Sequence, residues 1–440
     1  MISRHEIAQH IPQEGRKYDV VVAGGGPAGL GAALAAGRLG AKVLLLEARS
    51  FFGGVAATSL FMPINRLKLK GGTRGGIHEM LVSKLMSFDG LACREGKVTW
   101  TDGDGLHVHP DYLKEAIFQL LEETGVDYRL YSPVCGAKVE SGAVTQAVVL
   151  TKDGRTAFEA DVFIDCTGDG DLAYHAGAKT EAGREQDGAM MPITLGFALS
   201  NVDTDKLFAF YDADEKEHKL PGYVSHAREL GYSVAPWYSF DRTTVPGLVT
   251  VNNGGLAGVG ILNALHAQDA TVAERAGIRI AVDFVKWARE LKVPGLENCY
   301  LDRTGAAVGV RETRRVICDY VLTMEDATAG AEFEDVIARR YGAVDLAGLP
   351  ANENTDMKSG YAYPYRALLP VGLERLLVAG RCGSYTHLAL AAGKSMGNMM
   401  AIGQAAGAAA ALSVKAGVTP RELPAQAVQK ALIGTLGVKL

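Results

Sequence analysis

Short aliphatic runs alternate with helix-like segments along the first part of the chain. The run at 18–23 is rich in valine and predicts a fully buried strand. A glycine-rich turn follows, then an Ala/Leu pattern typical of a helix to residue 39, and a second apolar run at 42–47. This order predicts a strand–turn–helix–strand unit, which is the start of a parallel α/β sheet.

A second helix and a group of strands follow. The helix is predicted over 110–124, with Pro110 in its first turn, an apolar face that includes Leu113 and Ile117, and Gly125 after its end. The expected strands alternate with Ser-Gly and Asp-Gly turns. They cover 127–131, 135–140, 144–151 and 158–165.

The pattern changes near residue 171 and returns near the C-terminus. Aromatic residues and polar loops dominate the middle, which includes a long predicted helix over 272–291. A buried strand at 375–380 and a small-residue helix at 396–415 then resemble the N-terminal unit. We therefore predict an α/β fold with a Rossmann-like dinucleotide domain and an interleaved α+β substrate domain. The first covers 1–60, 105–175 and 340–440, and the second, a cap, covers 61–104 and 176–339.

Charge, apolar stretches and cysteine spacing exclude several classes of protein. The net charge of −5 at pH 7 gives no basic footprint for nucleic acid. No apolar signal segment opens the chain, and glycines interrupt both long uncharged stretches, 20–37 and 395–414, so no membrane span is expected. The 6 cysteines are dispersed without a CxxC pair, which argues against disulfide frameworks and local metal sites. We expect a reduced, cytoplasmic protein without a metal. The 53 glycines exceed the roughly 31 expected at average usage.

Some of these glycines form a Gly24-x-Gly26-x-x-Gly29 motif between the first strand and helix. Gly24 permits a tight turn, Gly26 lets a pyrophosphate approach the backbone, and Gly29 lets the helix pack on the sheet. Pro27 and Ala28 open the helix, whose N-terminal N–H groups and dipole favour phosphate. The motif predicts a dinucleotide site.

The next strand ends in an acidic residue, as this type of site requires. Glu47 lies 23 residues after Gly24 and is placed to accept hydrogen bonds from a ribose diol, with Ala48 beside it. Gly53, Gly54 and Thr58 follow closely.

Two further strand ends carry glycine turns. One is Thr167-Gly168-Asp169 and the other is Gly380-Arg381. A simple NAD domain needs neither these turns nor the Gly53-Gly54 segment, whereas a protein that wraps the larger FAD needs returning segments of chain. The sequence therefore favours FAD.

These and other motifs resemble the FAD-dependent oxidoreductases of the glutathione-reductase-like superfamily, near thiazole-biosynthesis flavoproteins, heterodisulfide-reductase flavoproteins and fumarate-reductase flavoproteins. The resemblance rests on segments along nearly the whole chain: 53–58, 164–172, 183–188, 309–315, 363–366, 378–382 and 403–407. It implies that Gly53, Gly54 and Thr58 lie near the pyrophosphate and the flavin N5 edge, and that Gly168 and Asp169 lie on the adenosine side. Gly380, Arg381 and the start of the last long helix would face the ribityl chain and flavin O2. That start comprises Met396, Gly397 and Asn398.

The chain lacks two sequence motifs that NADPH-driven hydroxylation would lead us to expect. The glycines at 255–260 have the wrong spacing for a second dinucleotide motif, so a dedicated NAD(P)H domain is not expected. Aromatic hydroxylases of the wider superfamily end their second FAD motif in Gly-Asp, where this chain has Gly380-Arg381. Both observations favour oxidation of a bound substrate over NADPH-driven hydroxylation.

Four residues are candidates for catalysis. His387, in a loop beside the expected flavin, is the leading general base, and Tyr385 is a weaker candidate. Arg311 and Arg366 are candidate anchors for a carboxylate or oxyanion. The alternatives are a structural histidine, an interdomain salt-bridge network around 311–315 and a tyrosine-rich core edge.

The favoured hypothesis is an enzyme that transfers a hydride from a small polar organic substrate to flavin N5. The electron acceptor is not set by the sequence, and a homo-oligomer is compatible with it. The alternative is an electron-relaying or structural FAD subunit of a larger complex, which the lack of clustered cysteines disfavours. A thiazole-synthase-like or RNA-modifying flavoprotein is a third hypothesis. The acidic pI disfavours RNA, and this hypothesis does not explain the middle domain.

Overall fold

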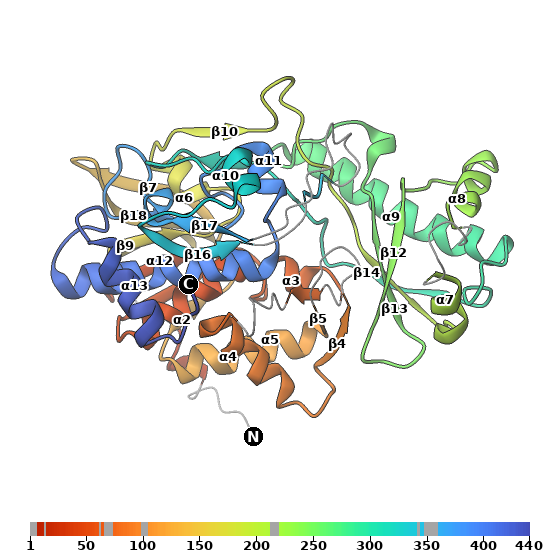
Figure 1. Ribbon diagram of the computed structural model, residues 1–440, viewed down its shortest axis with the longest axis horizontal. Coiled ribbons are helices and arrows are strands. Elements are labelled where there is room, and N and C mark those ends of the chain that lie inside the picture. The colour runs from red at the N-terminus through yellow and green to blue at the C-terminus, as the bar shows by residue number, and fades with distance from the viewer. Residues whose placement is uncertain are drawn as a thin grey trace.

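The computed structural model describes residues 7–12, 15–60, 63–65, 74–97, 104–211, 220–340, 344–346 and 360–440. Figure 1 shows a larger body built on a central sheet and a smaller body that carries α7, α8, α9 and β12 to β14. Both termini of the described chain belong to the larger body.

The central sheet has a parallel, Rossmann-like part, as the sequence predicts. Five strands run parallel in the order β6-β2-β1-β9-β18, and two antiparallel strands, β8 and β7, continue from β9. The strands are β1 (Tyr18–Ala23), β2 (Val43–Leu46), β6 (Asp127–Arg129), β7 (Val134–Glu140), β8 (Ala143–Thr151), β9 (Gly154–Asp165) and β18 (Leu376–Val378). In register, Val21 pairs with Leu44 on one side and Phe163 on the other. The predicted α/β fold with a Rossmann-like sheet is confirmed.

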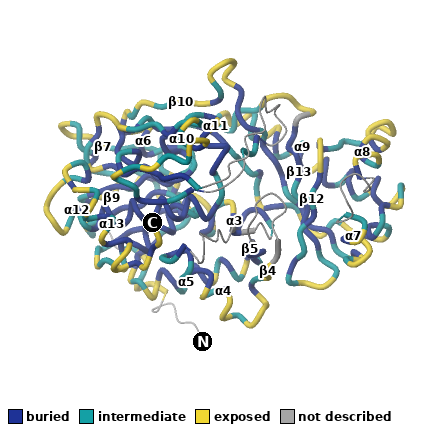
Figure 2. The backbone as a smooth tube through the Cα atoms, viewed as in Figure 1, coloured by how far each residue is buried: buried dark blue, intermediate teal, exposed yellow. Residues whose placement is uncertain are grey.

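Alternate side chains of the parallel strands enter two different hydrophobic cores. Val20 and Val22 pack with the helices on one face, whereas Val21 and Ala23 pack with the antiparallel strands on the other. Figure 2 shows the resulting continuous buried centre. Burial on both faces explains the continuous apolar runs at 20–23 of β1 and 43–46 of β2.

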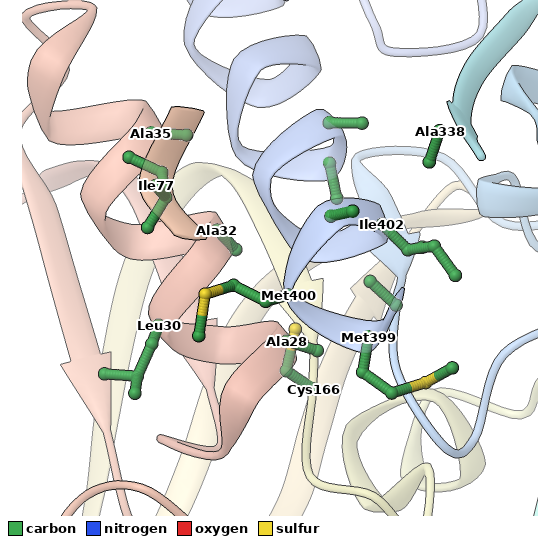
Figure 3. Close-up of a cluster of buried hydrophobic side chains, with 14 of the residues drawn as sticks. Ala28, Leu30, Ala32, Ala35, Ile77, Cys166, Ala338, Met399, Met400 and Ile402 are labelled. Carbon is green, nitrogen blue, oxygen red and sulfur yellow. The ribbon is translucent and has the colours of Figure 1, made fainter. Parts of the chain in front are cut away.

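The longer helices that supply the first of these cores cover one face of the sheet. They are α2 (Pro27–Arg38), α4 (Gly76–Met86), α5 (Pro110–Glu123), α12 (Met396–Ala416) and α13 (Ala425–Gly434). The helices α2 and α12 lie side by side, and Figure 3 shows Met400 of α12 pointing toward α2. Among the described residues, α12 is the one helix long and apolar enough to cross a membrane, and 72% of its most apolar window is buried inside the protein. It is a core helix of this fold.

The smaller body is a four-stranded antiparallel sheet with three helices. Its strand order is β12-β13-β11-β14. The elements are β11 (Phe197–Ser200), α7 (Thr204–Tyr211), α8 (Leu220–Glu229), β12 (Tyr238–Arg242), β13 (Val249–Asn253), η1 (Ala257–Val259), α9 (Ala267–Glu290) and β14 (Tyr300–Thr304). Phe284 and Trp287 of α9 pack against Phe197 and Tyr238 in its core. The predicted helix at 272–291 therefore exists, but it begins five residues earlier, after His266.

The hydrophobic cores divide the chain differently from the predicted domain boundaries. Ile77 and Leu81 of α4 and Leu106 belong to the larger core, although the sequence pattern places 61–104 in the cap. Residues 61–62, 66–73 and 98–103 of that region lie outside the described residues. The second core spans 193–308, and Leu322 and Ile337 already pack in the first. The amphipathic pattern of α4 indicates a buried face but not which body buries it.

The remaining elements include three small sheets, β3-β5-β4, β10-β15 and β16-β17. The elements are α3 (Val55–Thr58), β3 (Pro63–Asn65), β4 (Cys93–Lys97), β5 (Asp104–Val108), α6 (Asp171–His175), β10 (Thr180–Ala182), β15 (Arg314–Val316), α10 (Met324–Ala329), β16 (Val336–Arg340), β17 (Tyr361–Pro364), η2 (Tyr365–Leu368) and α11 (His387–Ala391).

Candidate functional site

The glycine loop between β1 and α2 has two closed positions and one open position. A Cβ added to Gly24, which has φ +96°, would lie 2.4 Å from the Cys166 carbonyl oxygen. One added to Gly29 would lie 1.7 Å from the Gly24 oxygen. At Gly26 the nearest atom is the Gly54 Cα, 3.8 Å away. Packing thus requires glycine at the first and third positions, while the space beside Gly26 is free.

Glu47 directly follows β2 and is only 7% exposed. Its carboxylate accepts hydrogen bonds from the backbone N–H groups of Gly25 and Arg49, each at 2.8 Å. Burial raises the pKa of Glu47, and these N–H donors oppose that rise. Each carboxylate oxygen keeps a second lone pair, so the group can still accept from a ribose hydroxyl. Ala48, beside it, is exposed.

The Gly53-Gly54 turn lies directly on the glycine loop. The Gly53 N–H donates to the Gly25 oxygen at 2.8 Å, and a Cβ on Gly54 would stand 2.8 Å from the Gly26 Cα. Thr58, at the end of α3, is buried, and its carbonyl accepts from Ala306, in the loop after β14. The segment therefore joins the phosphate loop to the smaller body.

The turns at the ends of β9 and β18 bind each other. Arg381 donates to the Asp169 carboxylate at 2.7 Å and to the Thr313 hydroxyl at 3.0 Å. Burial raises the pKa of Asp169, but Arg381 and Thr313 outweigh it and leave the pKa below its ordinary value. Thr167 closes its own turn, since its hydroxyl donates to Asp165 and accepts from the Asp171 N–H.

The end of β18 also reaches the start of α2. A Cβ on Gly380, which has φ +106°, would lie 2.9 Å from the Ala28 Cβ. A Cβ on Gly168 would lie 2.9 Å from the Arg381 guanidinium. Three turns from distant parts of the sequence thus converge on the glycine loop.

The start of α12 presents an uncapped helix terminus. Ser395 is the N-cap, yet its side chain makes no cap hydrogen bond, and its buried hydroxyl has no partner in the described part of the chain. Met396 is buried, as is Gly397. Asn398 donates to the Gly393 carbonyl at 3.1 Å and accepts from Arg74.

A buried carboxylate–imidazole pair lies at the start of α11. His387 Nδ1 is 2.8 Å from Glu312 Oε2, and both side chains are buried. Glu312 also accepts from the Met191 N–H at 3.1 Å and from Arg315. Arg315 in turn donates to the carbonyls of Tyr385 and Gly183, each at 2.9 Å. Sequence reasoning missed Glu312 as a functional residue, although it lies inside the 309–315 motif.

The three arginines of the 311–315 segment bind three different sets of partners. Arg311 donates to the Pro192 carbonyl and the Thr194 hydroxyl, both at 3.1 Å. Arg314 pairs with Asp171 at 3.0 Å, and Arg315 pairs with Glu312. The salt-bridge alternative thus describes Arg314 and Arg315, while Arg311 is held mainly by neutral acceptors.

Two predicted catalytic residues have other partners. Tyr385 is fully buried, its hydroxyl donates to the Gly380 carbonyl at 3.1 Å, and burial raises its pKa to about 12. Arg366 pairs with Asp335 and stacks on Tyr320, 4.7 Å from the ring centroid. Arg366 is 40% exposed on its side chain, so the structure places it in a partly exposed ion pair rather than at the imidazole.

A further arginine, not singled out by the sequence, is buried against an aromatic ring. Arg340 is fully buried, and none of its guanidinium nitrogens has a hydrogen-bond partner in the described part of the chain. It lies over the ring of Tyr385, 4.4 Å from the centroid, and a Cβ on Gly393 would stand 2.6 Å from its Nε.

These residues fit FAD. The open side of Gly26 next to the α2 terminus suits a pyrophosphate, and Glu47 suits the ribose. The Ser395 hydroxyl and the Arg340 guanidinium, which lack hydrogen-bond partners among the described residues, lie at the approach to α12 and suit the electron-rich O2 edge of a flavin.

Comparisons with known proteins identify the family of this chain. The chain matches the model of the family described as FAD dependent oxidoreductase over residues 19–432. It is similar to a geranylgeranyl bacteriochlorophyll reductase-like protein from Thermoplasma acidophilum, at 15% identity and a TM-score of 0.47, over 96% of this chain and 84% of that one.

Two other solved structures show distant likeness. A triple mutant of the flavin-dependent brominase Bmp2 is 14% identical, with a TM-score of 0.49, over 94% of this chain and 83% of that one. The THI4 protein of Thermovibrio ammonificans is 21% identical, with a TM-score of 0.30, over 41% of this chain and 69% of that one. The family match covers nearly the whole chain, and the protein therefore belongs to the FAD-dependent oxidoreductases, with FAD as its cofactor.

Proposed function

We propose that this flavoenzyme oxidises a small polar organic substrate, with His387 as the general base. The observation that carries the proposal is the 2.8 Å contact between His387 Nδ1 and Glu312. An ionised carboxylate only accepts hydrogen bonds, so Nδ1 is the donor, and in the neutral imidazole Nε2 then keeps its lone pair. That tautomer is the one a general base requires.

The surroundings hold this pair in one orientation. Thr386 caps α11, accepting from the Ala389 N–H at 3.3 Å, and so fixes the backbone of His387. Arg315 and the Met191 N–H hold the Glu312 carboxylate. The carboxylate also stabilises the imidazolium that forms when Nε2 takes a proton.

In the proposed reaction the cofactor takes the hydride and His387 takes the proton. Bound FAD would supply the hydride acceptor, its N5 atom, for a substrate C–H bond. His387 removes the proton from the adjacent hydroxyl or amine, which drives the bond electrons toward the carbon that loses the hydride. The resulting positive charge on His387 stays beside the Glu312 carboxylate, which stabilises it.

An anaerobic substrate panel tests the proposal. Purified holoenzyme is mixed with small alcohols, amines, hydroxy acids and amino acids, and the oxidised flavin absorbance is followed. Bleaching by one of these classes supports the proposal. An FAD-loaded protein that no compound bleaches, yet that chemical reductants reduce, would favour the electron-relaying role in a larger complex instead.

A further inference from the structure

Two largely buried cations share a single carboxylate oxygen near the proposed base. Lys394 Nζ lies 2.9 Å from Asp345 Oδ2, and Arg311 Nε lies 4.0 Å from the same atom. The side chains of Arg311 and Lys394 are 14% and 15% exposed, whereas that of Asp345 is 42% exposed. The positive groups are thus enclosed, and the negative group is at the edge.

Among the described residues, the other contacts of the two cations are with neutral groups. Arg311 donates to the Pro192 carbonyl and the Thr194 hydroxyl, and Lys394 donates to the Asp345 carbonyl. Burial lowers the pKa of Arg311. Burial and, more weakly, repulsion from Arg311 lower the pKa of Lys394, although the carboxylates of Asp345 and, least, Glu312 raise it.

Glu312 is another carboxylate in this neighbourhood, but other residues already neutralise its charge. It pairs with Arg315 and with His387. The group formed by Arg311, Lys394 and Asp345 therefore carries a net charge of about +1 in a largely buried setting, where charges are normally paired. Such a group attracts an anion.

Arg311 and Lys394 lie on the same two chain segments as the proposed base, His387, and its carboxylate partner. Arg311 directly precedes Glu312, which contacts His387, and Lys394 lies in the connection from α11 to α12, seven residues after His387. The same two segments thus supply the base, its orienting carboxylate and both cations.

We propose that Arg311 and Lys394 bind the carboxylate of the substrate, so that the enzyme acts on small carboxylic acids. This inference rests on the proposed function, because it names the class of substrate that His387 deprotonates. Arg311 supplies a planar fork that matches a carboxylate, and Lys394 supplies a point charge that strengthens the contact. Lys394 is therefore a specificity-determining residue.

Binding of propionate to the holoenzyme, measured by calorimetric titration, tests this site without turnover. Propionamide has nearly the same shape but no charge, and it is expected not to bind measurably. We expect Arg311→Met and Lys394→Met to weaken propionate binding about tenfold or more, as loss of a hydrogen bond between charged groups does. Lys415→Met removes an exposed charge from the far end of α12 and is expected to leave binding unchanged.

Lys394→Arg is the control for misfolding of the Lys394→Met variant. It keeps the positive charge, so its propionate affinity should stay within a few-fold of wild type. Equal binding of propionate and propionamide, or unchanged affinity in Lys394→Met, would overturn the site. The two proposals fail separately. Propionate binding that depends on Arg311 and Lys394, without bleaching by any acid, contradicts the proposed oxidation alone. Bleaching by neutral alcohols or amines that requires His387 contradicts the carboxylate site alone.

Discussion

The backbone of Gly403 in α12 touches that of Ala28 in α2. A Cβ built on Gly403 would stand 1.9 Å from the Ala28 carbonyl oxygen, and one on Gly407 would stand 2.0 Å from the Ala32 oxygen. The helix that opens at the glycine loop and the helix that opens at Ser395 are thus in direct backbone contact at these two glycines. We expect their relative position to set the distance between the two ends of the cofactor site.

Substitution of Gly403 by alanine is expected to destabilise the protein. The added methyl must displace backbone rather than a flexible side chain, and overpacking of this kind costs about 1–3 kcal/mol or more. Gly434→Ala is the matched control, because a Cβ there meets nothing within 4 Å. Urea denaturation of the holoenzyme measures both, and equal midpoints for the two variants would contradict the packing.

The glycine loop predicts opposite behaviour at two neighbouring positions. Gly26→Ala places its methyl in open space, so the fold should persist while FAD affinity falls, because the methyl occupies the side where pyrophosphate approaches. Gly24→Ala collides with the Cys166 carbonyl and should reduce stability itself. Thermal unfolding and FAD titration of each apoprotein separate the effects, and a Gly26→Ala variant with wild-type FAD affinity would contradict the assignment.

Asp165 predicts a specific pH dependence of stability. Burial raises its pKa to about 6, although Thr167 and the Ala173 N–H donate to it. The folded state then holds this proton more tightly than the unfolded state, so the contribution of Asp165 decreases as pH rises from about 4 to 6.

The comparison with Asp165→Asn isolates this effect from other carboxylates. The free energy of unfolding of wild type minus that of the variant should fall by up to about 3 kcal/mol between pH 4 and pH 7. Urea denaturation at these pH values measures it. A difference that increases with pH would show that the donors, not burial, control this carboxyl.

Tyr385→Phe tests whether this hydroxyl has a structural role. Its removal leaves the Gly380 carbonyl without that donor and should cost about 0.5–1.5 kcal/mol of stability. The pH profile of flavin reduction should not change, because a group with a pKa of about 12 stays protonated at neutral pH. A lost or shifted limb of that profile in Tyr385→Phe would show that Tyr385 takes part in catalysis.

The sequence predicted the sheet strands well because their signals are local. The runs at 20–23 and 43–46 are apolar throughout, and the glycine motif follows the first of them directly. The extent of the cap was not predictable in the same way. The core that takes the buried face of α4 depends on contacts with α5 and α12, which are distant in sequence.

The candidate site was only partly visible for a similar reason. His387 stood out as a lone histidine in a glycine-flanked loop, but its partner Glu312 is 75 residues away in sequence. Lys394 and Arg340 carry no motif of their own, and their importance comes from burial. Arg366 and Tyr385 have plausible residue types, but the fold gives them other partners.

The pH dependence of anaerobic flavin reduction in wild type, His387→Ala and Glu312→Gln tests the central claim most directly. With a substrate found in the panel, we expect His387→Ala to slow reduction by roughly 10²–10⁴-fold and to lose the fall in rate at low pH that protonation of a general base causes. Glu312→Gln should keep this low-pH limb at a lower rate, because the imidazole remains but loses its ionised partner. Wild-type rates and profile in His387→Ala would contradict the role of His387 as the base.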